Sequence, residues 1–401
     1  MQPSPRPLRI LTIVNLPWDA RLGASRVWME LAREWARAGH SVEKYCLTDA
    51  FPEPPYSRAG SALRQILFPR KAADYVRAHA DRFDVIDCLI GVLPFPKHTL
   101  RFRGLVVARS VGLFRLYNQF LRRSAARGPK QSEGRWFGHL FHRFIEWRAR
   151  IASEKSLRTC DLLNLPNEDE RRALASDPAI HAHTIVEPYG LNEQFLRSLR
   201  EAAAPAQQRL QGKTICFIGM WGPRKGAREW PQIMKAIWSH HPTAQFVFLG
   251  TMFDEAAVRA DLGAANETRI SCRPNFVEQD LPAILADCAL GIFPSHIEGF
   301  GLAVLEQLGA GLPTIAYDVP GPRQILQGEK DRLLVPVGDI AAIADRALHI
   351  LSLPLPEYEA LSAECIGVAS RYRWKEIAAN TIVQYRRELT SLTTEANGSD
   401  Q

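Results

Sequence analysis

Short apolar runs alternate with amphipathic segments along the first half of the chain. Residues 8–16 form a run rich in aliphatic side chains, and a second run follows at 42–47. Between them Val27, Leu31 and Trp35 recur every four residues, the spacing of a helix with one buried face. A strand, a helix and a second strand in this order predict a βαβ unit. Further apolar runs predict strands at 85–89, 105–108 and 161–165.

The second half of the chain repeats this alternation. Parallel strands need crossover connections, usually helices, so the pattern predicts a second parallel, doubly wound domain. Its strands are predicted at 214–219, 246–250, 269–272, 289–293, 314–316 and 333–335.

The order of these segments predicts where the domains begin and end. The first domain is expected over 1–195, completed by an amphipathic helix at about 374–390, and the second over 196–373. Within the second span, the polar, alanine-rich stretch 198–212 is expected to be the linker. Residues 391–401 are polar and are expected to form a disordered tail.

The composition is that of a globular protein with two domains. The 401 residues exceed one ordinary hydrophobic core, and 46% are hydrophobic against 23% charged. No apolar run approaches the length of a membrane-spanning helix, and the first residues lack a signal-peptide core. The seven cysteines are scattered without Cys-x-x-Cys pairs. This disfavours a disulfide framework or a zinc site and indicates a reducing, cytoplasmic compartment.

Positive charge is concentrated between residues 97 and 158. This segment holds fifteen Lys or Arg against three Glu, a balance of +12, whereas the whole chain carries +7. Apolar residues recur in it at helical spacing, with arginines between them: Trp136, Leu140, Phe144, Trp147 and Ile151. Two interpretations stay open, a core-packing helix with a solvated basic face and a surface for an anionic membrane or an anionic acceptor.

The stretch 292–326 contains two glutamates separated by seven residues. The strand at 289–293 is broken by Pro294, and the glycines that follow allow a tight turn before a short helix. Glu298 is expected in the turn and Glu306 more than a turn into the helix. Both carboxylates then border one crevice at the carboxyl end of a strand, where open α/β sheets bind ligands. The free N–H groups of the helix start suit a phosphate, and a carboxylate can accept hydrogen bonds from sugar hydroxyls.

This segment resembles the donor-site signature of the retaining glycosyltransferases of family 4, the glycosyl transferases group 1. The resemblance implies the α/β GT-B fold, in which two Rossmann-like domains with doubly wound parallel sheets face a cleft. It also implies that Glu298 contacts the donor sugar and that Glu306 holds the ribose of the nucleotide. Phe300, Gly301 and Leu302 are then expected near the donor, through their backbone and the helix start.

Other positions of the chain resemble the same family. The family has an arginine, a lysine and a glycine for the donor phosphates after the first strand of the second domain. Met220 stands in the place of the arginine, so Arg224 is expected to substitute for it. A histidine of the first domain is also missing, and Arg109, Ser110 or backbone groups would have to replace it. The matching phosphate-site and glycine-loop positions are Lys225, Gly226, Gly219 and, in the first domain, Gly23.

The resemblance implies an enzyme that transfers a sugar from a UDP- or GDP-linked donor with retention of the anomeric configuration. The acceptor, a sugar, a lipid-linked molecule or a small molecule, is left open. Glu298, Lys225 and Arg224 are the candidate catalytic residues, and no nucleophile is assigned. No cofactor and no metal is expected, because no two aspartates are separated by one residue and the His and Cys residues are unclustered.

Two alternatives from other classes stay open at this point. A nucleotide-sugar epimerase on the same fold would use the same donor domain but would need an acid and a base in the first domain. A nucleic-acid-binding module would explain the basic segment at 97–158, but not the two glutamates, and the common binding motifs are missing. The sequence therefore favours a transferase of glycan, glycolipid or glycoconjugate biosynthesis, with a possible anionic membrane contact through 97–158 and no nucleic-acid partner.

Overall fold

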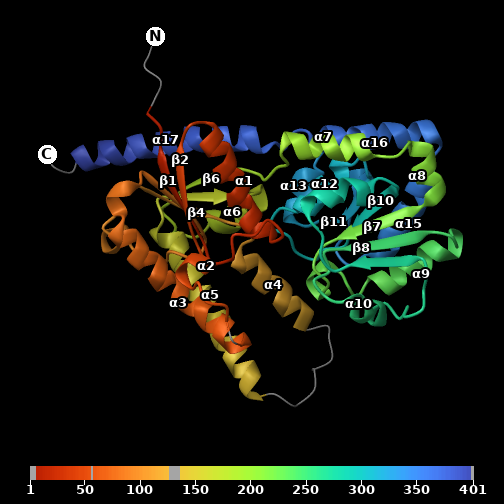
Figure 1. Ribbon diagram of the computed structural model, residues 1–401, viewed down its shortest axis with the longest axis horizontal. Helices are drawn as coiled ribbons and strands as arrows, with labels where there is room; N and C mark the ends of the chain where they lie inside the picture. The colour runs from red at the N-terminus through yellow and green to blue at the C-terminus, as the bar shows by residue number, and fades with distance from the viewer. Residues whose placement is uncertain (1–5, 56, 126–135, 399–401) are drawn as a thin grey trace, which may run out of the picture. The chain divides into compact units, whose positions relative to one another are not determined.

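A computed structural model describes residues 6–55, 57–125 and 136–398 of the chain (Figure 1). The chain divides into two compact units, called unit 1 (Met1–Pro188 with Lys375–Gln401) and unit 2 (Tyr189–Trp374). Each unit contains one six-stranded sheet whose strands pair in parallel. The predicted α/β class with two doubly wound parallel sheets is therefore confirmed.

The sheet of unit 1 has the strand order β2-β1-β3-β4-β5-β6. Strand β1 pairs with β2 on one side and with β3 on the other, with Ile10 opposite Val42 and Val85. Five side chains of β1, including Ile10 and Val14, are completely buried because helices cover both faces of the sheet. The strands are β1 Arg9–Val14, β2 Ser41–Cys46, β3 Val85–Leu89, β4 Leu105–Arg109, β5 Leu162–Leu165 and β6 His183–Val186.

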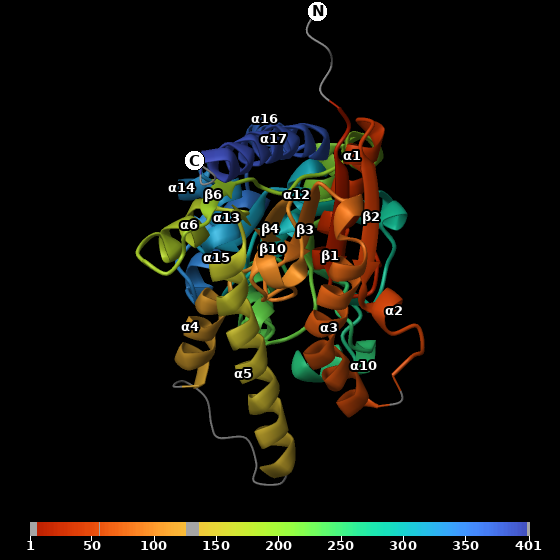
Figure 2. The same ribbon diagram turned by 90° about the vertical axis from the view of Figure 1, so that its left-hand side faces the viewer.

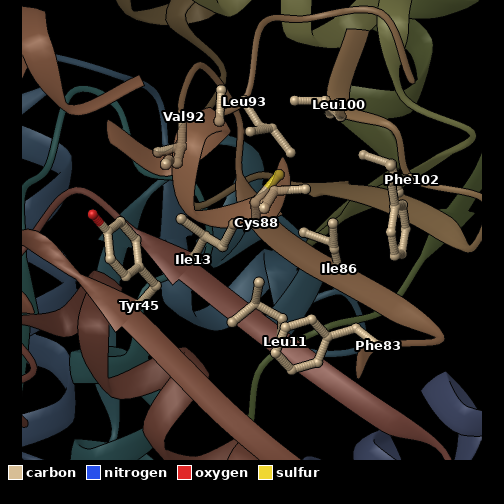
Figure 3. Packing of buried hydrophobic residues seen from close by; sticks show 14 of the residues in the cluster. Leu11, Ile13, Tyr45, Phe83, Ile86, Cys88, Val92, Leu93, Leu100 and Phe102 are labelled. Atoms are coloured by element: carbon tan, nitrogen blue, oxygen red, sulfur yellow. The ribbon is translucent and has the colours of Figure 1, made fainter. Parts of the chain in front are cut away.

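The helices of unit 1 pack on this sheet. One part of the core lies between the sheet and α3, where Leu11, Ile13, Ile86 and Cys88 form a cluster with Phe68 and its neighbours (Figure 3). The helices are α1 Gly23–Arg37, α2 Leu47–Ala50, α3 Arg58–Ala78, α4 Phe114–Ala125, α5 Trp136–Thr159, α6 Glu168–Ala175 and α17 Trp374–Gly398, with 3-10 turns η1 Ala80–Arg82 and η2 Lys97–Leu100.

A buried group of polar side chains ties α17 to the sheet of unit 1. The guanidinium of Arg109 donates to Asp87 at 2.7 Å, and Trp28 Nε1 donates to the same carboxylate at 2.9 Å. The hydroxyl of Tyr385, on α17, donates to Asp87 and accepts from Arg109 at 3.0 Å. Nearby, Trp35 Nε1 donates to the carbonyl of Ala378. These bonds anchor the C-terminal helix on strands β3 and β4 and on α1.

The sheet of unit 2 has the strand order β12-β11-β10-β7-β8-β9. The strands are β7 Thr214–Ile218, β8 Gln245–Leu249, β9 Ile270–Arg273, β10 Cys288–Phe293, β11 Thr314–Tyr317 and β12 Leu334–Val335. The helices are α7 Glu193–Ala202, α8 Ala206–Gly212, α9 Trp230–His240, α10 Glu255–Asp261, α11 Leu281–Leu285, α12 Leu302–Gly309, α13 Pro320–Ile325, α14 Lys330–Leu333, α15 Ile340–Leu351 and α16 Leu355–Ala369, with 3-10 turns η3 Pro223–Lys225 and η4 Glu278–Asp280.

The stretch 198–212 is not a loose linker, and that expectation was wrong. It forms the end of α7 and all of α8, both within unit 2. Leu199 is fully buried, and the side chain of Arg209 donates to the carbonyls of Cys288 at 2.7 Å and Gly311 at 2.9 Å. The polar composition did not predict this packing, because Arg209 donates to backbone carbonyls that only the tertiary fold brings near.

The C-terminal region also differs from expectation, since α17 continues to Gly398 where 391–401 was expected to be disordered. Threonine hydroxyls donate to carbonyls four residues earlier, as Thr393 does to Leu389 and Thr394 to Thr390, which is compatible with a helix. Residues 399–401 lie outside the described part of the chain. In the described ranges, no helix is both long enough and apolar enough to cross a membrane.

Helix α5 lies in the basic segment 97–158, over the stretch whose apolar spacing predicted a helix. Residues 126–135 of that segment lie outside the described part. Helix α5 lies beside α3 and extends away from the sheet of unit 1 (Figures 1 and 2). Phe144 and Trp147 are 48% and 46% exposed, whereas Leu157 near the C-terminal end is buried. The core-packing interpretation therefore holds only near Leu157 and is wrong for Phe144 and Trp147.

Candidate active site

The candidate site of unit 2 lies where the strand order of its sheet reverses. Strand β7 continues to β8 and β9 on one side, while β10 pairs on its other side, so the connections after β7 and β10 leave the sheet in neighbouring positions. A crevice at the carboxyl ends of such a pair of strands is the usual ligand position in open α/β sheets. The sequence-predicted residues of unit 2 follow these two strands.

The loop after β7 carries Arg224 and Lys225 in the 3-10 turn η3, which ends at Gly226. Gly226 has a left-handed backbone with φ of +80°, and a Cβ there would collide with the carbonyl oxygen of Pro294. A glycine is therefore required for packing between the two loops as well as for the turn. Gly219 leaves room for the lysine, whose Cδ and Cε lie 3.7 Å from the point where a Cβ at 219 would be.

The loop after β10 ends at Gly301, the N-cap of α12, with a left-handed backbone at φ of +99°. Leu302 is the first residue of this helix, so free backbone N–H groups lie at the predicted place. A second glycine, Gly321 at the start of α13, packs so closely on the backbone of Phe300 that a Cβ there would collide with it. The sequence did not single out Gly321, although its place beside two prolines was a visible turn signal.

Three charged side chains from the two loops meet. Lys225 Nζ is hydrogen-bonded to Glu298 Oε2, and Arg224 Nη1 lies 3.8 Å from the same oxygen. The ammonium of Lys225 also lies 4.5 Å from the centre of the Phe293 ring, within the range of a cation–π contact. The structure thus brings together all three candidate catalytic residues, 73 residues apart in the chain.

The electrostatics of this group follow from burial and from the pairing. Burial by itself would raise the pKa of the Glu298 carboxyl, but the charges of Lys225 and Arg224 and hydrogen bonds from Lys225 and Ser295 hold this pKa below its usual value. Burial lowers the pKa of Lys225; the charge of Glu298 opposes that shift and the charge of Arg224 adds to it. The Glu298 carboxylate therefore stays ionised next to two cations.

The other donor-site candidates of unit 2 lie along α12. Glu306 is in the second turn of the helix and only 5% exposed. The ring of Phe300 is buried against Tyr189 at 5.4 Å and Tyr372 at 5.7 Å between ring centres. The Phe300 side chain thus packs in the interior of unit 2, which leaves its backbone for a ligand role. The predicted sequence of turn, helix start and second carboxylate is present in the structure.

The candidates of unit 1 differ in their surroundings. Gly23 is the first residue of α1, and no atom lies within 4 Å of the place where its Cβ would be. Arg109 is fully buried and engaged with Asp87 and Tyr385, so this side chain cannot replace the missing histidine. The hydroxyl of Ser110 accepts from the N–H of Gly112 at 3.0 Å and is also buried. Both side chains are therefore hydrogen-bonded within unit 1.

Sequence reasoning missed a contact beside the charged group. His296, in the loop after β10, donates through Nε2 to the carboxylate of Glu229, which lies just before α9. His296 lies two residues before Glu298 in the donor-site segment. Nothing in the sequence indicated its partner, which is 67 positions away. The structure also shows no group of three or more His, Cys, Asp or Glu side chains arranged for a metal ion in the ranges that it describes.

Residues 212–353 match the protein family described as "Glycosyl transferases group 1". The chain is 26% identical over 194 residues to the GDP-mannose:cellobiosyl-diphosphopolyprenol alpha-mannosyltransferase of Xanthomonas campestris, covering 47% of this chain and 50% of that protein. The chain thus spans about half the length of this curated relative.

Solved structures share the fold over nearly the whole chain. Sucrose-phosphate synthase from Thermosynechococcus elongatus superposes with a TM-score of 0.71 at 18% identity, covering 96% of this chain and 100% of that one. Anabaena HepE, solved in complex with UDP-glucose, superposes with a TM-score of 0.63 at 15% identity, covering 95% and 99%. At these identities the likeness concerns the fold alone, and it supports the predicted two-domain GT-B architecture.

Proposed function

The chain carries a group 1 glycosyl transferase domain at residues 212–353, as the sequence predicted, and from this premise we propose its activity. The protein transfers a sugar from a nucleotide-diphosphate-sugar donor to an acceptor, with retention of the anomeric configuration, in glycoconjugate biosynthesis. The donor is UDP- or GDP-linked. Both nucleotides occur among the similar proteins, since the Xanthomonas relative is named for GDP-mannose and HepE was solved with UDP-glucose.

The observation that carries this proposal is the group formed by Lys225, Arg224 and Glu298 beside the start of α12. When the sugar leaves its donor, negative charge builds up on the nucleotide diphosphate. Two fixed cations and the N–H groups of a helix start can stabilise that charge without moving during the reaction. Glu298, in the loop before α12, is assigned to the sugar hydroxyls, and Glu306, in the second turn of α12, is assigned to the ribose.

The assignment of the two glutamates makes a distinguishing test possible. Glu306→Ala should weaken the binding of donor and of free nucleotide alike, because the ribose is present in both. Glu298→Ala should mainly lower turnover, because its contact requires the sugar. Each loss is expected at about 1.5–3 kcal/mol, the usual range for a hydrogen bond to a charged group. Full activity in both variants would contradict the site.

The donor is best identified by a thermal-shift screen of UDP- and GDP-sugars with the whole chain, since ligands that bind the folded state raise its melting temperature. The same donors incubated without an acceptor distinguish a transferase from an epimerase, because an epimerase would release isomeric nucleotide sugar. The similar proteins whose names state an activity, the alpha-mannosyltransferase and the sucrose-phosphate synthase, are not named as epimerases.

We also propose that the transfer needs neither a divalent metal nor another cofactor. The proposal rests on Lys225 and Arg224, which supply fixed positive charge where many sugar transferases use a metal ion. Turnover should therefore persist in excess EDTA. Activity that disappears with EDTA and returns with magnesium or manganese would show that the two cations are not sufficient.

The acceptor is proposed to be lipid-linked and to be met at the cytoplasmic face of a membrane. On α5, exposed Phe144 and Trp147 lie 5.9 Å apart between ring centres, and exposed Arg143, Arg148 and Arg150 lie on the same helix. Aromatic rings beside arginines are typical of surfaces that bind anionic lipid headgroups. The Xanthomonas relative, whose name includes a diphosphopolyprenol, is consistent with such an acceptor.

Sedimentation with anionic liposomes tests this surface. The protein should sediment at low salt and be released as the salt concentration rises, because the attraction is electrostatic. Replacing Arg143, Arg148 and Arg150 with glutamine should abolish sedimentation. A control with the same loss of charge replaces three exposed arginines elsewhere, Arg171, Arg172 and Arg197, and should still sediment. No binding of the native protein at low salt would contradict the membrane contact.

A further inference from the structure

The two loops of the candidate site are joined by hydrogen bonds that involve none of the ligand-binding side chains proposed above. The N–H of His296 donates to the carbonyl of Arg224 at 2.9 Å. The imidazole of His296 then reaches Glu229 at the far end of the β7 loop. His296 thus holds the β7 loop at two points, on either side of Lys225.

The imidazole is enclosed on its other side as well. Its ring centre lies 5.3 Å from that of Tyr317, a completely buried residue at the carboxyl end of β11. His296 and Glu229 are themselves only 17% and 13% exposed. Because a carboxylate only accepts hydrogen bonds, the proton of this bond lies on Nε2 of the histidine. The ring is therefore fixed in orientation by a partner from the β7 loop and by packing on β11.

We infer that His296 and Glu229 are positioning residues that hold the loop bearing Arg224 and Lys225 at a set distance from the loop bearing Glu298. This inference rests on the proposed function, because it assigns the pair to the binding of the donor diphosphate. Two cations stabilise a diphosphate only when they are held where its oxygens lie, and small displacements of such groups lower binding and rate strongly. In this role the two residues act through the backbone of Arg224 and the path of the loop.

The test compares a nucleoside diphosphate with its monophosphate, measured by calorimetric titration of the whole chain. UDP and UMP, or GDP and GMP, differ in the phosphate that Lys225 and Arg224 are proposed to bind. In His296→Asn the shorter amide cannot reach Glu229, and the affinity for the diphosphate should fall about tenfold, the usual effect of losing one hydrogen bond to a charged group. The affinity for the monophosphate should change less than about twofold.

Two further variants make the expected result specific. His296→Gln places an amide nitrogen near the position of Nε2 and should restore most of the preference for the diphosphate. Glu229→Ala removes the partner instead of the histidine and should lower the diphosphate affinity by the same factor as His296→Asn. His240→Asn is the matched control, since His240 is exposed at the end of α9, and it should bind both nucleotides like the native protein.

Each outcome decides a different point. Equal losses for diphosphate and monophosphate, or no loss, in both His296→Asn and Glu229→Ala would overturn the positioning role while leaving the proposed function intact. Failure of the native protein to bind any UDP, GDP or nucleotide sugar would instead overturn the proposed function, and the inference with it. If circular dichroism shows that His296→Asn does not fold, the positioning role is tested by Glu229→Ala alone, from the ratio of its affinities for the diphosphate and the monophosphate.

Discussion

Each unit contains an ion pair with little exposure to solvent, and the two pairs differ in what surrounds them. In unit 1 the side chains of Arg109 and Asp87 are both 0% exposed, and the carboxylate also accepts from Trp28 and Tyr385. In unit 2 the side chains of Lys225 and Glu298 retain 12% and 15% exposure. The first pair lies on neighbouring strands inside the sheet, whereas the second lies on two loops at its carboxyl edge.

This difference indicates which ion pair can take part in ligand binding. The bonds around Asp87 come from two strands, α1 and α17, so a change of partner would require these elements to separate. The Lys225–Glu298 contact joins two loops, so an incoming phosphate can attract the lysine without moving a strand. The role proposed for the Lys225–Glu298 pair therefore rests on its position on two loops and not on its burial.

The largest expected effect is on stability, at the pair in unit 1. Arg109→Met leaves the Asp87 carboxylate buried without its cation and should lower the free energy of unfolding by about 3–5 kcal/mol. Lys225→Met should lower the free energy of unfolding by less than about 1 kcal/mol, because Glu298 is near solvent and Arg224 remains close to it. Urea titration of both variants measures the two losses. Equal losses of stability in the two variants would show that the two ion pairs do not differ in their contribution to folding.

The next effect concerns turnover and is expected only at the pair in unit 2. Lys225→Ala should lower kcat/KM by about 10²–10³-fold, the usual loss when one electrostatic donor to a transition state is removed, while its free energy of unfolding changes by less than about 1 kcal/mol. Lys235→Ala, an exposed lysine on α9, is the matched control. A similar fall in turnover for Lys235→Ala would show that the effect is not specific to the site.

A buried carboxylate that has no cationic hydrogen-bond partner among the described residues extends the comparison. Glu170, on α6, is 1% exposed and accepts from the N–H of Leu113, with Ser110 and Asn167 as further partners, and burial raises its pKa to about 7. The folded pKa lies above the unfolded value of 4.5, so between these two pH values the folded chain binds more protons. Its contribution to the free energy of unfolding must therefore fall as the pH rises from about 4.5 to about 7.

Glu170→Gln removes this titration while keeping an oxygen for the Leu113 N–H. The variant should be more stable than the native protein by about 1–3 kcal/mol at pH 8 and equally stable near pH 4.5. Urea titrations at both pH values measure the difference. An equal difference at both would show that the burial of this carboxyl does not govern the pH dependence.

The smallest effects are expected at Gly226 and Gly23, two of the candidate glycines that follow the first strand of a unit. Gly226→Ala forces a side chain into Pro294 at positive φ and should cost about 1–3 kcal/mol of stability. Gly23→Ala meets open space at a helix start, so its stability should change by less than about 0.5 kcal/mol. A fall in turnover for Gly23→Ala at native stability would assign Gly23 to the substrate; unchanged turnover would remove it from the site.

The sequence by itself determined the architecture of each unit and the local course of the donor-site segment. Apolar runs of strand length, separated by helical periods, were sufficient to place every strand except β6, because buried parallel strands are nearly continuous in hydrophobicity, whereas β6 is only partly buried. The turn at 294–301 and the helix that follows it were also predictable, because Pro294, Gly299 and Gly301 act on the backbone locally. Glu298 and Glu306 were found in this way.

Only the tertiary structure decided which distant residues meet. The pairing of Lys225 with Glu298 spans 73 positions, that of His296 with Glu229 spans 67, and that of Tyr385 with Asp87 spans 298. These contacts depend on the order of strands in the sheets and on the packing of α17. Likewise, the exposure of Trp147 and the burial of Arg209 depend on neighbouring elements. Hydrophobic periodicity indicates whether a side chain prefers water. The neighbours of that side chain in the folded protein come from segments far away in the chain.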